Sequence, residues 1–174
     1  MPKEKWNKVF SDIFGECNIQ WKQDLVSQID FGSDALVTTK KGRKYSIDVK
    51  TRHQDFLGYK TWLLEIVHHR YTDETKRKKT DTVPGWLYRS TSDLIIIGTV
   101  DDIDEPTDIN EYVCFSLIPF KNEDFKGSIN FLCNGWAATE FDNGTFQLTL
   151  NKKAPLGFLQ DYSNFPCKYW RKNE

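Results

Sequence analysis

Hydrophobic and polar positions near the start of the chain predict a helix followed by a β-hairpin. Residues 3–14 carry apolar side chains at helical spacing, and Gly15 follows as a stop signal. Residues 34–39 and 44–51 are rich in side chains that favour strands, and the polar, glycine-containing segment 40–43 joins them. We therefore expect an amphipathic helix and then two antiparallel strands.

Later segments predict further strands separated by loops. Residues 93–100 form a nearly continuous apolar run, which is typical of a strand covered on both faces. Other strands are predicted at 61–69, 111–117 and 146–150. The charged segment RYTDETKRKKTDTVPG is expected to be a loop. Because no repeat or long linker divides the 174 residues, we expect a single α/β domain over residues 1–174, with a central mixed β-sheet flanked by helices.

Composition and charge narrow the class of protein. An aromatic content of 14% and a charged fraction of 28% indicate a folded domain and not a disordered chain. The formal net charge of -1 excludes a strongly basic, histone-like binder, so a polyanion would have to be bound by a local basic patch. No run approaches the roughly 18 apolar residues that span a membrane, and MPKEKWNKVF lacks the apolar stretch of a signal peptide. We expect a cytoplasmic protein without a membrane partner.

The cysteines are scattered along the chain without a CxxC pair, at Cys17, Cys114, Cys133 and Cys167. This spacing fits neither a zinc site nor a disulfide framework. Reduced thiols are the expected state.

Charged residues in the second strand of the hairpin carry the candidate chemistry. Alternate side chains of a strand share a face, so Tyr45, Ile47 and Val49 point one way and Ser46, Asp48 and Lys50 the other. The apolar set is expected to face the core, and the polar set a cleft or solvent. A tight hairpin also brings Asp34 opposite positions 48–50, so we expect Asp34, Asp48 and Lys50 to cluster.

Two neighbouring carboxylates repel each other, and a hard divalent cation relieves that repulsion. Mg²⁺ prefers oxygen ligands and keeps several waters, which suits a site made by Asp34 and Asp48. Such a metal can acidify a bound water and stabilise charge on a phosphate. Lys50 beside it could position or deprotonate the water, or neutralise developing charge.

This arrangement resembles the PD-(D/E)XK nuclease superfamily, in which an acidic residue begins one strand and (D/E)-x-K lies on the next strand of a hairpin. Gly32-Ser33-Asp34-Ala35-Leu36-Val37 would supply the first element and Asp48-Val49-Lys50 the second. The leading helix and the strands at 61–69 and 93–100 also fit, so the resemblance covers about residues 1–100. It implies a restriction-endonuclease-like or Holliday-junction-resolvase-like nuclease, with Mg²⁺ (or Mn²⁺) at Asp34 and Asp48 and with Lys50 as a catalytic residue.

The resemblance also allows an acidic residue from the first helix, where Glu4, Asp12 and Glu16 are weak candidates, and two acidic residues outside that helix are further candidates. Asp30 is a rival to Asp34, but it precedes the predicted strand and is therefore the weaker choice. Glu65 lies within the apolar strand WLLEIVHH, where an unpaired carboxylate would be costly. Glu65 could pair with Lys50, extend the metal site as a catalytic residue, or form a salt bridge with an arginine.

A basic run follows the strand at 61–69 and is a candidate phosphate-binding segment. Its cations are Arg70, Lys76, Arg77, Lys78 and Lys79. A charge run can equally be a solvated loop, but beside a metal and phosphate site it could bind a nucleic-acid backbone. The nearby Trp86 is more typical of core packing than of base stacking. His68 and His69 should face opposite sides of their strand, so a joint metal site is not expected.

The sequence thus favours a Mg²⁺-dependent endonuclease or exonuclease acting on DNA, with double-stranded or branched DNA as the expected substrate. One alternative is a catalytically inactive nuclease-like domain that binds nucleic acid or a protein partner. Another is a structural α/β protein, in which Asp34 and Lys50 would lie apart. RNA as substrate, a homodimeric state, and a role in restriction, recombination or phage DNA processing all stay open.

Overall fold

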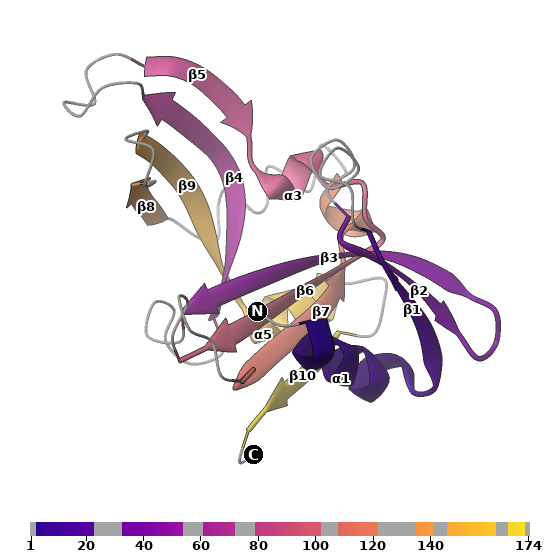
Figure 1. Ribbon diagram of the computed structural model, residues 1–174. Helices are drawn as coiled ribbons and strands as arrows, with labels where there is room; N and C mark the ends of the chain where they lie inside the picture. The colour runs from indigo at the N-terminus through magenta and orange to yellow at the C-terminus, as the bar shows by residue number, and fades with distance from the viewer. Residues whose placement is uncertain are drawn as a thin grey trace.

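A computed structural model describes residues 3–22, 33–53, 61–71, 79–101, 108–121, 135–140, 146–162 and 167–172. These residues form a mixed α/β domain with two β-sheets and few, short helices (Figure 1).

The larger sheet has six strands in the order β1-β2-β3-β6-β7-β10. Their bounds are Cys17–Trp21 (β1), Ala35–Thr39 (β2), Lys44–His53 (β3), Leu94–Val100 (β6), Glu111–Ser116 (β7) and Lys168–Arg171 (β10). Strands β3 and β6 pair in parallel, and every other neighbouring pair in this sheet is antiparallel. The chain segment between the parallel strands contributes to the second sheet.

The second sheet has four antiparallel strands in the order β5-β4-β9-β8. Their bounds are Thr61–Tyr71 (β4), Lys79–Pro84 (β5), Gly135–Glu140 (β8) and Phe146–Pro155 (β9). Figure 1 shows this sheet set apart from the larger one, with the short helix α3 (Trp86–Arg89) between them.

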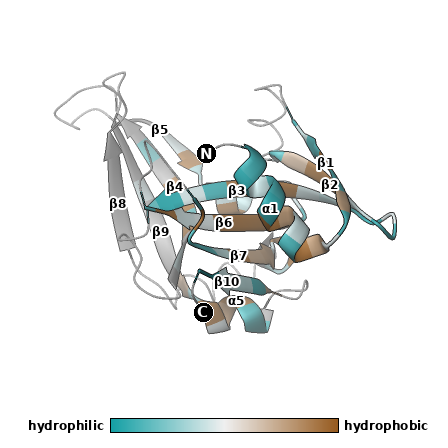
Figure 2. Cartoon of the chain, turned by 60° about the horizontal axis from the view of Figure 1, so that its bottom comes forward, coloured by the Kyte–Doolittle hydropathy of each residue, from teal (hydrophilic) through white to brown (hydrophobic). Residues whose placement is uncertain are grey.

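Helix α1 (Lys3–Phe14) covers one face of the larger sheet. Its buried side chains Trp6, Val9 and Phe10 pack on apolar residues of β2, β3, β6 and β7. Gly15 ends the helix with a φ of 71°, a left-handed conformation that glycine adopts without steric cost. Figure 2 shows α1 lying across the sheet over the hydrophobic strand β6.

The opposite face of the larger sheet packs against β4 and two short helices. Alternate side chains of β6 and β7 point to this face, where they join apolar residues of β4, α3 and α5 (Leu156–Tyr162) in a second core cluster. A short 3-10 helix, Ile118–Lys121, follows β7. All seven residues of β6 are buried, as expected of the strand shared by both clusters.

The predicted helix, hairpin and mixed sheet are confirmed, but one prediction about the segment between the parallel strands is wrong. The strand expected at 61–69 is confirmed as β4, which belongs to the second sheet and not to the sheet that carries Asp48. Residues 79–84, expected to be part of a loop, form β5 because their backbone groups pair with β4. The larger sheet instead gains β1 at its edge, a strand that the sequence pattern did not predict.

Two further predictions concern the cysteines and membrane insertion. Cys17, Cys114 and Cys167 are free thiols, and burial raises the pKa of each. Cys133 lies outside the described residues. Among the described residues, no helix is long and apolar enough to cross a membrane.

Candidate metal and catalytic site

The β2–β3 hairpin brings Asp34 and Asp48 to neighbouring positions. Ala35 pairs with Ile47, so Asp34, one residue before β2, lies opposite Asp48 on β3. Two hydrogen bonds fix Asp34: its backbone N–H donates to the Ile47 carbonyl at 2.8 Å, and its Oδ2 accepts from the Val49 N–H at 2.8 Å. The predicted approach of Asp34 to positions 48–50 is confirmed.

Asp48 is buried, which corrects the expectation that the polar face of β3 opens onto a cleft or solvent. Asp48 is only 1% exposed. The parallel register pairs Asp48 with Ile95, and Ile95 belongs to the core cluster under β4 and α3. The polar face of β3 is therefore covered by the same elements that cover this face of β6.

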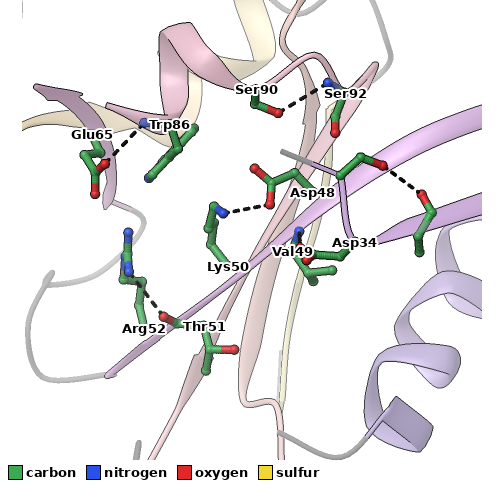
Figure 3. A network of polar contacts seen from close by, with 12 residues as sticks. Asp34, Asp48, Val49, Lys50, Thr51, Arg52, Glu65, Trp86, Ser90 and Ser92 are labelled. Atoms are coloured by element: carbon green, nitrogen blue, oxygen red, sulfur yellow. Dashed lines mark hydrogen bonds and ion pairs between the residues drawn. The ribbon is translucent and has the colours of Figure 1, made fainter. Parts of the chain in front are cut away.

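Lys50 forms an ion pair with Asp48 inside this layer. Lys50 Nζ lies 2.7 Å from Asp48 Oδ1, and the Lys50 side chain is 26% exposed. The Lys50 ammonium therefore lies at the buried carboxylate, while part of the Lys50 side chain is exposed. The three predicted residues Asp34, Asp48 and Lys50 come together, whereas a purely structural α/β protein was expected to hold Asp34 and Lys50 apart (Figure 3).

Burial raises the pKa of Asp48 to about 7. Desolvation of the ionised carboxylate is the largest cause, the ion pair with Lys50 opposes it, and the nearby Asp34 carboxyl raises the pKa further. Asp48 consequently exchanges its proton near neutral pH. Pairs of carboxylates with a perturbed pKa are typical of functional sites as well as of metal sites.

The carboxylate pair fits a Mg²⁺ or Mn²⁺ ion. Asp48 Oδ2 is buried and accepts no hydrogen bond from the described residues, so one carboxylate oxygen stands without a partner beside Asp34. Within those residues, no group of three or more His, Cys, Asp or Glu side chains is placed to bind a metal. Two carboxylates nevertheless suit Mg²⁺, which retains several waters and uses substrate phosphates as further ligands.

Arg52 continues the polar row along β3 and was not among the predicted site residues. It lies on the same face as Asp48 and Lys50, two positions beyond the lysine. Arg52 Nε is buried and makes no hydrogen bond to the described residues. Burial lowers the pKa of Arg52, while Glu65 and Asp48 raise it. The predicted strand stopped at residue 51, although the alternation of charged residues at 48, 50 and 52 was a usable signal.

Glu65 faces this row from β4 and links it to α3. Its Oε1 accepts a hydrogen bond from the backbone N–H of Trp86 at 3.2 Å. Gly85 allows this approach, since a Cβ there would lie 2.3 Å from the Glu65 carbonyl oxygen. Of the three roles expected for Glu65, the structure shows an electrostatic interaction with an arginine, Arg52. Figure 3 shows Lys50 between Asp48 and these two residues.

The predicted basic loop is in part a hairpin. Arg70 lies in β4 and Lys79 begins β5, where it pairs with Tyr71. Lys76, Arg77 and Lys78 lie outside the described residues, as does Asp30.

Trp86 and His69, which lie near this hairpin, contact other residues of the fold. Trp86 is buried in the second core cluster, as expected. His69 Nδ1 lies 2.9 Å from Thr82 Oγ1 on the partner strand.

Comparisons with protein-family models, curated proteins and solved structures find no significant match to this chain. The chemistry of the site itself therefore carries the functional inference.

Proposed function

We propose that this protein is a Mg²⁺-dependent nuclease that hydrolyses phosphodiester bonds in DNA. One observation carries the proposal, a buried carboxylate, Asp48, beside Asp34. Lys50 Nζ lies 2.7 Å from one Asp48 oxygen, and the other oxygen has no hydrogen-bond partner among the described residues. Burying such a group costs stability unless it is compensated, so its presence favours a chemical role. The resemblance of Asp34 and Asp48-Val49-Lys50 to the PD-(D/E)XK pattern supports the same conclusion.

Asp34 and Asp48 would hold the metal, each contributing carboxylate oxygen. A bound divalent cation supplies positive charge next to a phosphate and lowers the pKa of a coordinated water. The protein must present Asp48 ionised for this purpose, and Lys50 favours that state because its ammonium lowers the pKa of Asp48. The Val49 N–H donates a hydrogen bond to the Asp34 carboxylate and thereby fixes its orientation.

Lys50 is the residue best placed to act on the substrate. Its ammonium lies 2.7 Å from the Asp48 carboxylate and its side chain is 26% exposed, so a phosphate bound by the metal would lie next to this ammonium. There it can orient the attacking water or neutralise charge that develops on the phosphate. Glu65 and Arg52 are positioning residues in this proposal, since they fix the far side of the polar row.

A second candidate function is a nuclease-like domain that binds nucleic acid or a protein without cutting. The burial of Asp48 and the lack of a third acidic ligand among the described residues favour it. In that case Asp48 and Lys50 would be a structural ion pair. The basic cations from Arg70 to Lys79 could contact phosphates under either function.

The test is incubation of the purified full-length protein with plasmid, linear and branched DNA, in Mg²⁺, in Mn²⁺ and in EDTA. We expect cleavage with either metal and none in EDTA. The Asp48→Ala protein should bind the DNA without cutting it, and its affinity should rise slightly because a negative charge has been removed near the phosphates. DNA binding without any cleavage by the unaltered protein would favour the second candidate.

A further inference from the structure

A cleft on the opposite side of the hairpin shares Asp34 with the candidate metal site. It has a volume of about 220 Å³, and α1, the end of β1 and β3 form its walls. Val49 and Thr51 line it from β3, on the face that packs towards α1. Because Asp34 also lines the cleft, a ligand bound there would lie next to the proposed metal ligand.

One wall of this cleft is a tryptophan ring held in a fixed orientation. Trp21 Nε1 donates a hydrogen bond to Asn7 Oδ1 at 2.8 Å, and the Trp21 ring centroid lies 5.4 Å from that of Phe10. Trp6, also part of the lining, is 4% exposed and packs closely on β6. A Cβ at Gly98 would lie 2.7 Å from the Trp6 ring, so a glycine there permits this packing. The aromatic wall is therefore preorganised.

Two lysines add positive charge to the same cleft. Lys3 Nζ lies over the Trp21 ring, 5.8 Å from its centroid, so a base stacked there would move this flexible side chain aside. Lys22 follows Trp21 directly. The Lys22 backbone N–H donates to the Asp34 carbonyl at 2.9 Å, which fixes the start of the Lys22 side chain at the cleft. An aromatic wall with adjoining cations is the combination that binds single-stranded nucleic acid, by base stacking and phosphate contacts.

We propose that this cleft binds one unpaired nucleotide of the substrate, with its base against the Trp21 wall and its phosphate between Lys3 and Lys22. The proposal rests on the nuclease function and specifies its substrate: DNA with an unpaired nucleotide, at a strand end or a branch point. An intact duplex keeps its bases paired and stacked, so it cannot fill the cleft without unstacking a base. The metal proposed at Asp34 would then lie next to the neighbouring phosphate.

The test compares the affinity of full-length Asp48→Asn protein for two fluorescent DNA hairpins in EDTA. One hairpin is blunt, and the other carries a single-stranded tail of five thymidines. We expect about tenfold tighter binding of the tailed hairpin, the size of effect expected when one base stacks on an aromatic ring. Trp21→Ala should abolish the preference, and Lys3→Ala combined with Lys22→Ala should reduce it.

A matched control removes the same charge from the far end of β2. The control is the double variant Lys40→Ala, Lys41→Ala. Both lysines lie beyond Thr39 at the turn, where Lys40 pairs with the exposed Glu16. It should keep the preference for the tailed hairpin. Melting temperatures close to that of the parent protein should establish that every variant is folded.

Equal affinity of the parent for both hairpins, or an unchanged preference in the Lys3, Lys22 variant, would overturn the cleft proposal. Neither result depends on cleavage, because binding is measured in a variant and a buffer that prevent it. Failure of the nuclease function shows separately, as absence of metal-dependent cutting by the unaltered protein. A preference that depends on Lys3 and Lys22 would still support the cleft in that case.

Discussion

The two faces of β3 are buried alike but carry opposite chemistry. Ile47 is 0% exposed and packs under α1, while its neighbour Asp48 is 1% exposed and lies on the face covered by β4 and α3. Apolar burial at Ile47 stabilises the fold directly. The Asp48 carboxylate, buried beside a second carboxylate, opposes folding whenever it is ionised. One strand thus packs on one face and, under the proposed function, carries the chemistry on the other.

The free-energy cost of burying Asp48 depends on pH. The pKa of Asp48 rises from 3.8 to about 7 on folding, so between these pH values the folded state holds a proton that the unfolded state has released. The contribution of Asp48 to stability is therefore present below about pH 3.8 and lost as the pH rises through 7. A carboxylate that weakens the fold at neutral pH makes sense where a cation binds it.

The largest effect is expected when the charge on the polar face of β3 is removed. Asp48→Asn should lower metal-dependent cleavage at least about a thousandfold, since a metal ligand contributes several kcal/mol of transition-state stabilisation. The melting temperature at pH 8 should stay the same or rise, because a buried charge has gone. Cleavage is measured by gel assay of branched DNA.

A matched control for this variant is Asp108→Asn. Asp108 pairs on the surface with Lys5 and Lys172, away from the β2–β3 hairpin. Cleavage should be unchanged in this control. A fully active Asp48→Asn protein would remove Asp48 from the site.

On the apolar face, Ile47→Ala should act on stability and not on chemistry. The cavity left under α1 should cost about 2 to 5 kcal/mol of the free energy of unfolding, measured by urea denaturation. Cleavage per folded molecule should stay near that of the parent. A loss of activity with unchanged stability would show that the two faces are not functionally distinct.

Lys50→Met separates a catalytic role for Lys50 from a structural one. We expect turnover to fall about a hundredfold or more, while the melting temperature changes little. Because Lys50 lowers the pKa of Asp48, the variant should also need a higher pH to bind Mn²⁺. A large drop in melting temperature that Asp48→Asn repairs in the double variant would instead show that Lys50 mainly balances the buried charge of Asp48.

The smallest effect is expected from the basic run between Arg70 and Lys79. Neutralising Lys76, Arg77, Lys78 and Lys79 together should weaken DNA binding. The slope of the logarithm of the binding constant against the logarithm of the salt concentration should become flatter, by up to about one for each phosphate that the protein no longer neutralises. Turnover at saturating DNA should change little. Binding measured by anisotropy at several salt concentrations tests this, and an identical slope would assign the run to solvated surface.

Local pattern predicted the parts of the site that lie on one hairpin. Strand alternation placed Asp48 and Lys50 on one face, and the turn at 40–43 fixed Asp34 opposite them. The same alternation continues to Arg52, which was missed because the strand was expected to end sooner. Within one hairpin, sequence spacing determines geometry.

The burial of Asp48 could not be predicted, because segments that are distant in the sequence bury it. Whether a strand such as β4 joins the sheet of β3 or another sheet depends on its partners, and β4 pairs with β9, far along the chain. The edge strand β1 was missed because Cys17–Trp21 is short and mixes polar with apolar residues. Burial of Asp48, and with it the raised pKa, follows from that long-range arrangement.

Metal binding at the carboxylate pair is the central claim, and calorimetric titration of Mn²⁺ into the full-length protein tests it most directly. The protein should bind one ion at pH 8 and bind it more weakly at pH 6, because Asp48 must lose its proton near pH 7 before it can serve as a ligand. Asp34→Asn and Asp48→Asn should each abolish that binding in folded protein. Equal Mn²⁺ affinity in both variants and the parent would contradict the account.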